Sequence, residues 1–463
     1  MVQVEVIATE ELGDRSYLAH DGKVAVVIDP QRDIDRVQAV LRRLGVRCVL
    51  VAETHIHNDY VSGGYQLARA TGADYAVSEG DAVEFDHHPV CDGEELTAGS
   101  MTVRVVATPG HTDHHVSYVV SDHTGAPPVV FSGGSLLYGS VGRTDLVDRA
   151  RTRELAHAQY HSARALASLL PQDAGLFPTH GFGSFCSAGS TFSGPRATIG
   201  DERRGNDVLT EADEDRFVRR LIDGLIPYPA YYAHMGARNR SGPTPVDLSA
   251  PERIDSRQLR ERIAAGQWVV DLRDRNLYAA DHLVGTIGIG LSNSFATWLG
   301  WLIPWGTPLT LIGQTFEQVA DAQRQLVRIG IDKLAGQAIG EPDELADPDR
   351  RRGYRVASFA ELARRPQDAT IVLDVRRDDE WEHSHIPGAL HIPLPDLPRR
   401  LAEVPAGQVW VHCAGGYRAS IAAGLLDRAG RDLVCVDDEY RHAEQLGLVT
   451  AVTTVTERHG ASR

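Results

Sequence analysis

The sequence predicts a multidomain α/β protein, and three observations support this fold class. The chain has 463 residues, which is enough for about three domains. From the N-terminus to about residue 190, apolar runs of strand length alternate with amphipathic helical patterns. In the C-terminal half two separate motifs recur at one common spacing, which indicates a duplicated domain.

The first elements establish the N-terminal α/β pattern. Residues 24–28 form an apolar run, and a helical pattern with one apolar face follows. We expect Asp33 to cap that helix at its start and Gly45 to end it. A second apolar strand at residues 48–52 then leads into a loop that is rich in histidine.

A linker and a repeat divide the rest of the chain. The Ser-Gly-Pro-Thr-Pro run at residues 241–245 is typical of a linker. Beyond it, Asp-Leu-Arg at 271–273 recurs as Asp-Val-Arg at 374–376, and His-Leu-Val-Gly at 282–285 recurs as His-Ile-Pro-Gly at 385–388, each 103 residues later. We therefore expect an N-terminal domain at residues 1–245 and two related α/β domains at residues 253–345 and 355–450.

The second copy carries a loop suited to sulfur chemistry. An apolar strand at residues 408–412 leads into a Cys-x-x-Gly-x-Arg loop ahead of a helix that we expect to begin near Ala419. The residues of this loop are Cys413, Ala414, Gly415, Gly416, Tyr417 and Arg418. Its glycines allow a tight turn that directs backbone amides inward, and its arginine adds a fixed cation. Together with the positive end of the helix, these groups favour a thiolate and can hold an anionic persulfide.

Cys413 is therefore the predicted nucleophile, and a buried structural cysteine is the alternative interpretation. In the first copy Gly313 stands at the corresponding position, so we expect no sulfur transfer there. Asp374 and Arg376 sit at a strand end, where an ion pair or a turn is the expected role.

This loop, together with residues 374–376, Glu382 and residues 385–389, resembles the rhodanese (thiosulfate sulfurtransferase) family over about residues 355–450. The resemblance implies a Cys413 persulfide, which takes sulfane sulfur from thiosulfate or a thiol persulfide and passes it to a second nucleophile. Arg418 and the loop amides would steady the anion. Residues 253–345 look like a rhodanese domain without its nucleophile, with a role in packing and orientation.

Histidines follow three predicted strands of the N-terminal domain. His55, His57 and Asp59 share one loop, while His111 and His180 each come directly after an apolar strand. Such side chains suit a divalent metal such as zinc or ferrous iron. The candidate ligands are these four histidines and Asp59.

Four other histidines are expected to be mostly solvated: His87, His88, His114 and His115. Of these, His115 lies near enough to the motif histidines in sequence to be considered as well. A single histidine is more often a surface or hydrogen-bonded core residue than a ligand.

The histidine motifs, together with Gly-Arg-Thr-Asp-Leu at residues 142–146, resemble the metallo-β-lactamase superfamily over about residues 1–240. The likeness is to the persulfide dioxygenase and glyoxalase II branch, and it implies an αββα sandwich with a metal site at one edge. Tyr60 stands where that branch has a histidine, which favours one metal over two. Gly134 stands where the family has a metal-binding aspartate, so an iron triad of two histidines and one carboxylate is incomplete. What remains at the family's first metal position is His55, His57 and His111, and Asp59 and His180 are either further ligands or groups that support the ligands. Asp59, Asp113 and Asp145 are the candidates for the missing carboxylate.

The fused domains resemble the multidomain persulfide dioxygenase/sulfurtransferases. That resemblance implies one Fe(2+), on which dioxygen and a low-molecular-weight thiol persulfide meet to give sulfite. The rhodanese domain would then transfer sulfane sulfur to or from thiosulfate or sulfite, a chemistry that fits hydrogen sulfide detoxification. Two alternatives stay open: a sulfurtransferase with a degenerate metal domain, and a Zn(2+)-dependent thioester hydrolase in which three histidines activate water.

Composition disfavours several classes of partner. The net charge of −16 would repel nucleic acid and anionic membranes. No apolar run approaches the roughly 18 residues of a membrane span, and the first residues lack a signal-peptide pattern. The 5 cysteines are widely scattered, unlike a disulfide framework. We expect a cytoplasmic protein acting on small molecules, and a homo-oligomer is compatible with the sequence.

Overall fold

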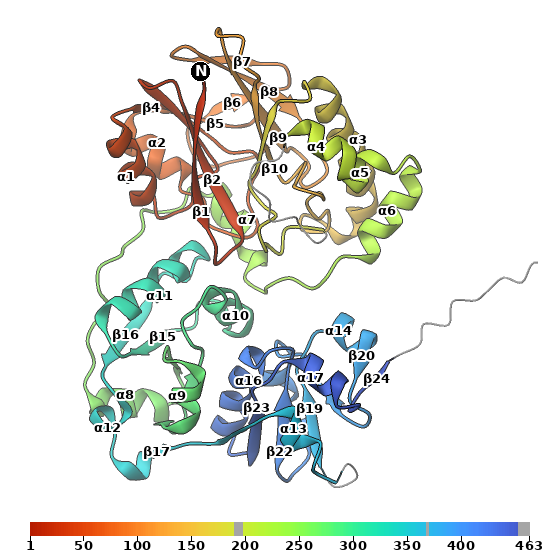
Figure 1. Ribbon diagram of the computed structural model, residues 1–463. Coiled ribbons are helices and arrows are strands. Elements are labelled where there is room, and N and C mark those ends of the chain that lie inside the picture. Colours follow the sequence, from red (N-terminus) through yellow and green to blue (C-terminus); the bar gives the residue numbers. More distant parts are fainter. Residues whose placement is uncertain (189–197, 367–369, 452–463) are drawn as a thin grey trace, which may run out of the picture. The chain divides into compact units, whose positions relative to one another are not determined.

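In the computed structural model, which describes residues 1–188, 198–366 and 370–451, the N-terminal part of the chain folds around two facing β-sheets (Figure 1). The first sheet contains, in spatial order, β1 (Gln3–Thr9), β2 (Asp14–His20), β3 (Val24–Ile28), β4 (Arg47–Ala52), β5 (Asp74–Ser78) and β6 (His88–Val90). The second contains β11 (Gly175–Pro178), β10 (Val129–Gly133), β9 (Val116–Asp122), β8 (Met101–Ala107) and β7 (Glu95–Ala98).

Strand direction decides where the loops of these sheets meet. In the second sheet β9 is antiparallel to both β8 and β10, and β11 is parallel to β10. β8, β10 and β11 therefore run the same way, and the residues that follow them gather at one edge. The end of β4 reaches the same place, because Val116 N–H, at the start of β9, donates to Thr54 O at 2.8 Å.

Three hydrophobic clusters define the layers of this part. One lies between the sheets and joins residues such as Val26 and Leu50 to Val103 and Phe131. Another covers the outer face of the first sheet with α1 (Asp35–Leu44) and α2 (Gly64–Thr71). The third covers the outer face of the second sheet with α3 (Thr152–Leu169) and α6 (Glu214–Asp223). The order helix, sheet, sheet, helix confirms the predicted αββα sandwich.

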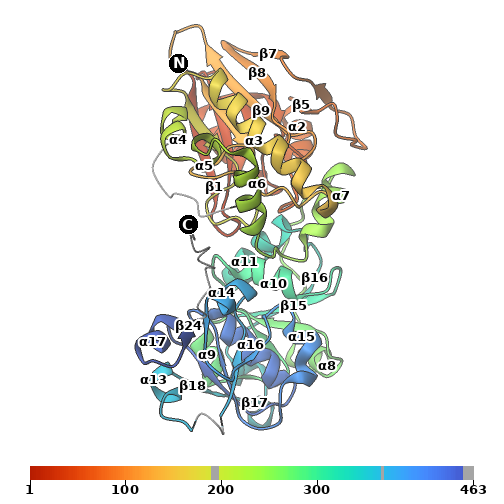
Figure 2. The same cartoon turned by 90° about the vertical axis from the view of Figure 1, so that its right-hand side faces the viewer.

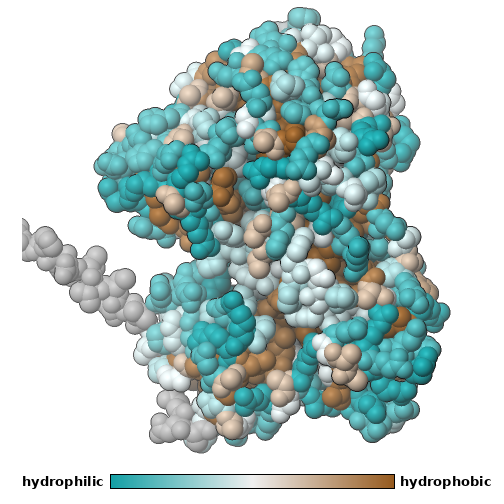
Figure 3. Space-filling view, turned by 180° about the vertical axis from the view of Figure 1, so that it is seen from behind, coloured by the Kyte–Doolittle hydropathy of each residue, from teal (hydrophilic) through white to brown (hydrophobic). Residues whose placement is uncertain are grey.

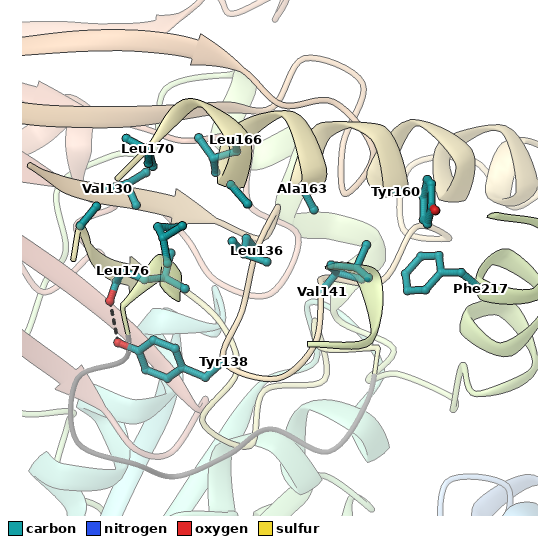
Figure 4. Close-up of a cluster of buried hydrophobic side chains, with 14 of the residues drawn as sticks. Val130, Leu136, Tyr138, Val141, Tyr160, Ala163, Leu166, Leu170, Leu176 and Phe217 are labelled. Atoms are coloured by element: carbon teal, nitrogen blue, oxygen red, sulfur yellow. Dashed lines mark hydrogen bonds between the residues drawn. The ribbon is translucent and has the colours of Figure 1, made fainter. Parts of the chain in front are cut away.

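The third cluster shows how α3 is held. Leu166 and Ala163 of α3 lie toward Val130 and Leu136 (Figure 4), and Figure 2 shows the helix running across the second sheet. The buried Tyr138 hydroxyl donates a hydrogen bond to Leu176 O at 2.7 Å within this cluster. Burying these apolar side chains fixes β10 and β11, whose ends carry the site described below.

The capping of α1 is predicted correctly at one end only. The helix ends at Gly45, which has a left-handed φ of 67° that suits glycine. At the other end Ile34 is the N-cap and no side chain caps the helix, so the expectation for Asp33 is wrong. The Asp33 carboxylate instead lies 2.8 Å from both Arg36 and Arg328, and these charges outweigh the capping interaction.

The chain groups into two compact units. The first comprises Met1–Leu248, Ser292–Gly300 and Gln323–Asp332, and the second comprises Ser249–Leu291, Trp301–Ala322 and Lys333–Arg463. The remaining helices up to residue 248 are α4 (Ile199–Gly205), α5 (Asp207–Thr210) and α7 (Tyr232–Arg240). The three domain ranges expected from the sequence stay a prediction.

The second unit is built on two small parallel sheets. One contains β14 (Ile287–Gly288), β12 (Trp268–Asp271), β15 (Leu309–Gly313) and β16 (Leu334–Ile339). The other contains β18 (Arg355–Ala357), β23 (Leu433–Val436), β22 (Val409–His412), β19 (Ile371–Asp374) and β21 (Leu390–His391). The two-stranded ribbons are β13 (His282–Leu283) with β17 (Arg351–Arg352), and β20 (Ser384–His385) with β24 (Thr450–Ala451).

Helices of the C-terminal half lie between these strands along the chain. They are α8 (Ser256–Ala264), α9 (Arg275–Ala280), α10 (Phe295–Leu302), α11 (Phe316–Arg328), α12 (Pro342–Leu345), α13 (Phe359–Leu362), α14 (Asp378–His383), α15 (Leu397–Arg400), α16 (Tyr417–Arg428) and α17 (Tyr440–Gln445). Alternation of strand and helix around parallel sheets agrees with the α/β class predicted for both copies.

Matched contacts relate the two copies. Arg376 makes a buried ion pair with Asp374 at 2.6 Å, and Arg273 makes the same pair with Asp271 at 2.7 Å. Each arginine also donates to a backbone carbonyl eight residues beyond it, Ser384 O in one copy and Asp281 O in the other. The ion pair predicted for Asp374 and Arg376 is confirmed, and its counterpart agrees with a duplication.

No helix among the described residues is long and apolar enough to cross a membrane. Hydrophilic residues cover much of the face seen in Figure 3, with hydrophobic residues in smaller groups between them.

Candidate functional site

Five buried imidazoles meet at the edge where β4, β8, β10 and β11 end. They belong to His55, His57, His111, His115 and His180, and each is at most 2% exposed. The ring centroids of His55 and His57 are 4.1 Å apart, those of His55 and His111 are 4.8 Å apart, and those of His111 and His180 are 5.3 Å apart.

Two ring nitrogens of this cluster lack a partner in the described part of the chain, and two others lie against each other. Among the described residues, His57 Nδ1 and His111 Nε2 are buried without a hydrogen bond. His55 Nε2 lies 3.3 Å from His180 Nε2. One ring nitrogen each of His55, His57 and His180 lie within 4.8 Å of one another. A buried nitrogen without a partner costs about 1–3 kcal/mol, so a divalent metal bound by these lone pairs fits the residues present.

The outward-facing nitrogens are held firmly. His111 Nδ1–H donates to Arg143 O at 2.7 Å, which leaves Nε2 as the lone-pair nitrogen. His180 Nδ1 lies 2.9 Å from Asp14 Oδ1 and 3.1 Å from Asp59 Oδ2. Such outer partners fix the orientation of metal-binding imidazoles and raise their basicity.

His57 has an unusually acidic outer environment. Its Nε2 lies 3.2 Å from both Asp29 Oδ1 and Glu53 Oε2. The Tyr60 hydroxyl is 3.0 Å from the same nitrogen, and the Tyr60 ring stacks on the imidazole. Tyr60 thus holds the outer side of the His57 ring. The family resemblance implies a histidine ligand of a second metal at this position.

Burial and charge set the protonation of these rings. Burial lowers the pKa of His57, but Asp29 and Glu53 outweigh it and raise the pKa to about 9. The pKa of His180 is raised to about 10, because Asp59 and Asp14 overcome the same burial. For His111, burial and the neighbouring His180 lower the pKa to about 3. His57 and His180 therefore release protons when a metal binds.

Gly134 occupies the position where the family has a metal-binding aspartate. A Cβ there would lie 2.3 Å from His111 Cδ2, so no larger side chain fits beside this ring. Of the three candidate replacements, Asp113 pairs with Arg151 and Asp145 pairs with Arg143, both at 2.7 Å. Asp59 remains within the cluster, where it holds His180.

The prediction that His115 is solvated is wrong. Its ring is 1% exposed and lies 5.0 Å from the His55 ring. His115 Nε2 accepts from Gly134 N–H at 3.0 Å, and Nδ1 is 2.9 Å from Thr108 Oγ1. The chain turns back into the sandwich just before β9, which carries this histidine inward. Of the other three, His114 is exposed, and His87 and His88 are half-buried.

Several residues of the site were not singled out from the sequence: Asp14, Asp29, Glu53 and Cys186. The carboxylates hold His57 and His180, as described above. Cys186 is 1% exposed, and burial raises the pKa of its thiol well above the usual value. Asp29 offered one sequence signal, since it directly follows the apolar run of β3. In the structure its backbone has a positive φ of 49°.

The sulfur loop lies in the second unit, between β22 and α16. The strand begins at Val409, one residue later than expected. The helix begins at Tyr417, two residues before the expected Ala419. Cys413 is 1% exposed, and Gly416 has the positive φ of 85° that the tight turn requires. The first amides of α16 have no acceptor within the helix and can therefore face an anion.

Polar groups brace this loop from three sides. Tyr440 N–H donates to Ala414 O at 2.8 Å, and the Tyr417 hydroxyl donates to Gly290 O at 2.8 Å. Arg418 binds Glu380 through both terminal nitrogens, at 2.5 and 2.7 Å. Burial opposes its charge, but Glu380 and Cys413 raise the pKa of Arg418.

Two family models match the chain. The metallo-beta-lactamase superfamily matches residues 12–180, and the rhodanese-like domain matches residues 358–440. The human persulfide dioxygenase ETHE1, a mitochondrial protein, is 30% identical over 220 residues, which is 47% of this chain and 77% of that protein. A probable polyketide biosynthesis zinc-dependent hydrolase, BaeB of Bacillus velezensis, is 28% identical over 166 residues, which is 35% of this chain and 69% of that protein.

Among solved structures, a metallo-beta-lactamase from Staphylococcus aureus has a TM-score of 0.66 and 28% identity. The match covers 73% of this chain and 99% of that one.

Proposed function

Because this chain belongs to the metallo-beta-lactamase superfamily, is homologous to persulfide dioxygenases and carries a rhodanese-like domain, we propose that it oxidises a thiol persulfide at its histidine cluster and transfers sulfane sulfur on Cys413. At the coarser level it is an enzyme of sulfur metabolism. The substrates in this proposal are a low-molecular-weight persulfide, dioxygen, and thiosulfate or sulfite. A working thiol needs a reducing compartment, so a cytoplasmic location is part of the proposal.

The observation that carries the oxidation step is the pair of buried nitrogens without partners, His57 Nδ1 and His111 Nε2. His57 would bind one metal ion together with His55 and His180, whose ring nitrogens lie within 4.8 Å of one another. His111 would join them through His180, since nitrogens of these two rings lie within the same distance. Ferrous iron at this place would polarise dioxygen and the persulfide sulfur and bring them together.

The residues around the cluster orient the histidine rings and shield the site from water. Arg143 O holds His111 in one tautomer, while Asp14 and Asp59 hold His180. Asp29 and Glu53 retain the Nε2 proton of His57, so that Nδ1 is the nitrogen left for binding. With every ring buried, bulk water is kept from the reacting sulfur.

The transfer step uses the Cys413 thiolate as nucleophile. It attacks the outer sulfur of thiosulfate, the sulfur–sulfur bond breaks, and sulfite leaves with the bonding electron pair. The resulting Cys413 persulfide anion faces the first amides of α16, with Arg418 close by. Cys413 can also be loaded from a thiol persulfide: the thiolate attacks the outer sulfur, the sulfur–sulfur bond breaks, and the thiol leaves with the bonding electron pair. Sulfite then attacks the terminal sulfur of the Cys413 persulfide and gives thiosulfate and the free thiolate. This direction would consume the sulfite made by the first unit.

The test combines metal analysis with two single variants of the full chain. Protein purified without oxygen should contain one iron per chain and take up dioxygen when a thiol persulfide is added. His111→Ala should lose the metal and the oxygen uptake but keep sulfur transfer from thiosulfate to cyanide. Cys413→Ser should show the opposite pattern. Wild-type protein with neither iron nor oxygen uptake would exclude the dioxygenase.

A second candidate is a sulfurtransferase whose first unit has lost oxidation chemistry. The observation that favours it is Gly134, which leaves no room for the expected carboxylate beside His111. This candidate predicts that sulfur transfer depends on Cys413 and that the protein takes up no dioxygen, whichever metal it is loaded with.

The third candidate is a zinc-dependent thioester hydrolase, supported by the neutral all-imidazole ligand set. It predicts thioester cleavage with one zinc ion bound, and loss of cleavage in His111→Ala.

A further inference from the structure

Cys186 lies in the metal cluster, although no step above uses it. Its sulfur and one ring nitrogen each of His111 and His180 lie within 4.8 Å of one another. The side chain is 1% exposed, and it contacts the Tyr232 hydroxyl at 4.0 Å and the Asp59 carboxylate. A thiol this close to two imidazole nitrogens is placed where it could bind a metal together with them.

His111 provides an independent sign of a ligand at the same point. Its Nε2 is buried and has no hydrogen-bond partner among the described residues. Arg143 O takes the Nδ1 proton, so Nε2 can only offer its lone pair. Without a metal, this nitrogen would stay unsatisfied in the group it forms with Cys186.

One backbone segment positions both side chains. Arg143 accepts from His111 through its carbonyl and donates from its own N–H to Cys186 O at 2.8 Å. Cys186 N–H in turn donates to Ser184 Oγ at 3.2 Å. The loop that carries the thiol is therefore tied to the residue that orients the imidazole, as expected for two ligands of one ion.

The charge balance of the cluster points the same way. Gly134 removes the carboxylate that would have been the anionic ligand, and Asp113 and Asp145 are engaged with arginines. Asp14 and Asp59 contact the outer nitrogen of His180, and Asp29 and Glu53 contact that of His57. In these contacts the carboxylates offset the charge of a bound metal only through the rings. A thiolate offsets part of that charge, and sulfur is a good ligand for zinc, cobalt and iron.

We propose that Cys186 binds the metal of this centre through its thiolate, beside His111 and His180, and so replaces the carboxylate that Gly134 eliminates. This assignment rests on the metal site of the proposed function but not on its reaction. On binding, the metal takes the sulfur lone pair and the thiol proton is released to solvent.

The test is an anaerobic titration of the metal-free full chain with Co(2+), followed by absorption spectroscopy. The wild-type protein should show a thiolate-to-cobalt charge-transfer band in the near ultraviolet. Cys186→Ser should lose that band and bind Co(2+) about 10–100-fold more weakly. Cys48→Ser, Cys91→Ser and Cys413→Ser are the matched controls and should keep the band.

A second variant guards against misfolding. Cys186→Asp should recover much of the lost affinity, because it supplies an anionic oxygen ligand, but it should show no charge-transfer band. Circular dichroism checks that each variant is folded. Stoichiometric Co(2+) in the wild-type protein without the band would overturn the role of Cys186 and leave the metal site standing. No Co(2+) binding at all would overturn both.

Discussion

Gly134 is the residue whose small size matters most in the N-terminal site. Adding one methyl group there would place a carbon 2.3 Å from His111 Cδ2, well inside van der Waals contact. We expect Gly134→Ala to push the His111 ring away, lowering the free energy of unfolding by about 1–3 kcal/mol and weakening metal binding. Urea unfolding and a Co(2+) titration measure the two effects.

Gly205→Ala is the matched control. A Cβ at Gly205 has no neighbour within 4 Å, and the residue lies in α4, where alanine is favoured over glycine. This variant should leave metal binding unchanged, and the free energy of unfolding should stay the same or rise by up to about 1 kcal/mol. Equal behaviour of the two variants would show that the space beside His111 is not what requires glycine at position 134.

Asp81 offers a pH-dependent prediction away from the catalytic groups. Burial raises the pKa of this carboxyl to about 6, so in the folded state it holds its proton more tightly than in the unfolded chain. Its presence is harmless below pH 4 and becomes destabilising as the pH rises through 6. Asp81→Asn should therefore raise the free energy of unfolding by about 2–3 kcal/mol at pH 8.

The same Asp81→Asn variant should show almost no gain at pH 3.5, where the wild-type carboxyl is mostly protonated in both states. Urea unfolding at the two pH values gives the comparison. A gain that does not depend on pH would mean that the substitution acts through packing and not through ionisation.

The strand-end ion pairs stabilise corresponding elements in the two copies. Arg376 and Asp374 are buried at the end of β19, and Arg376 also lies 3.6 Å above the Tyr440 ring. Arg376→Met would leave a buried carboxylate without its partner, at a cost of about 3–5 kcal/mol. We expect faster hydrogen exchange in β19 and β22, measured by mass spectrometry.

Two further variants separate charge from packing in these elements. Adding Asp374→Asn to Arg376→Met should restore much of the protection, because no charge then remains buried. Arg273→Met should produce the same effect in β12 and β15 of the other copy. If either single substitution made hydrogen exchange faster in both copies, the claim that each ion pair stabilises only its own copy would be contradicted.

Strand ends also explain which parts of the site were predictable. His55, His57, His111 and His180 each follow an apolar strand, and the ends of parallel strands meet, so their convergence could be expected. Cys413 was found in the same way, from a strand followed by glycines and a helix. These inferences depend only on local pattern and on the direction of neighbouring strands.

The positions of the remaining site residues depend on how the loops fold back onto the sandwich. His115 is carried inward by the turn before β9, and Cys186 is placed by a backbone contact to Arg143, 43 positions earlier in the sequence. Asp29 and Glu53 directly follow the parallel strands β3 and β4, but their contact with His57 depends on how the loop after β4 folds back. Sequence spacing does not encode such tertiary contacts, and the pairing of Asp33 with Arg328, in place of a helix cap, is a further example.

Joining oxidation and sulfur transfer in one chain should matter for the whole molecule. If sulfite made in the first unit is consumed on Cys413 of the same chain, covalent linkage raises its effective concentration. A mixture of His111→Ala and Cys413→Ser chains contains both activities, but only on separate molecules. Supplied with a thiol persulfide and dioxygen, this mixture should form thiosulfate more slowly than an equal amount of wild-type protein and should release more free sulfite.

The difference should shrink as the concentration of the mixed variants rises, because encounter between separate chains then approaches the linked rate. Chromatographic measurement of sulfite and thiosulfate over time gives both quantities. Wild-type protein mixed with the doubly inactive chain is the control for total protein and should keep its rate per active chain. Equal thiosulfate formation by the mixture and the wild type at every concentration would mean that sulfite diffuses freely between chains, and that fusing the two activities gives no kinetic advantage.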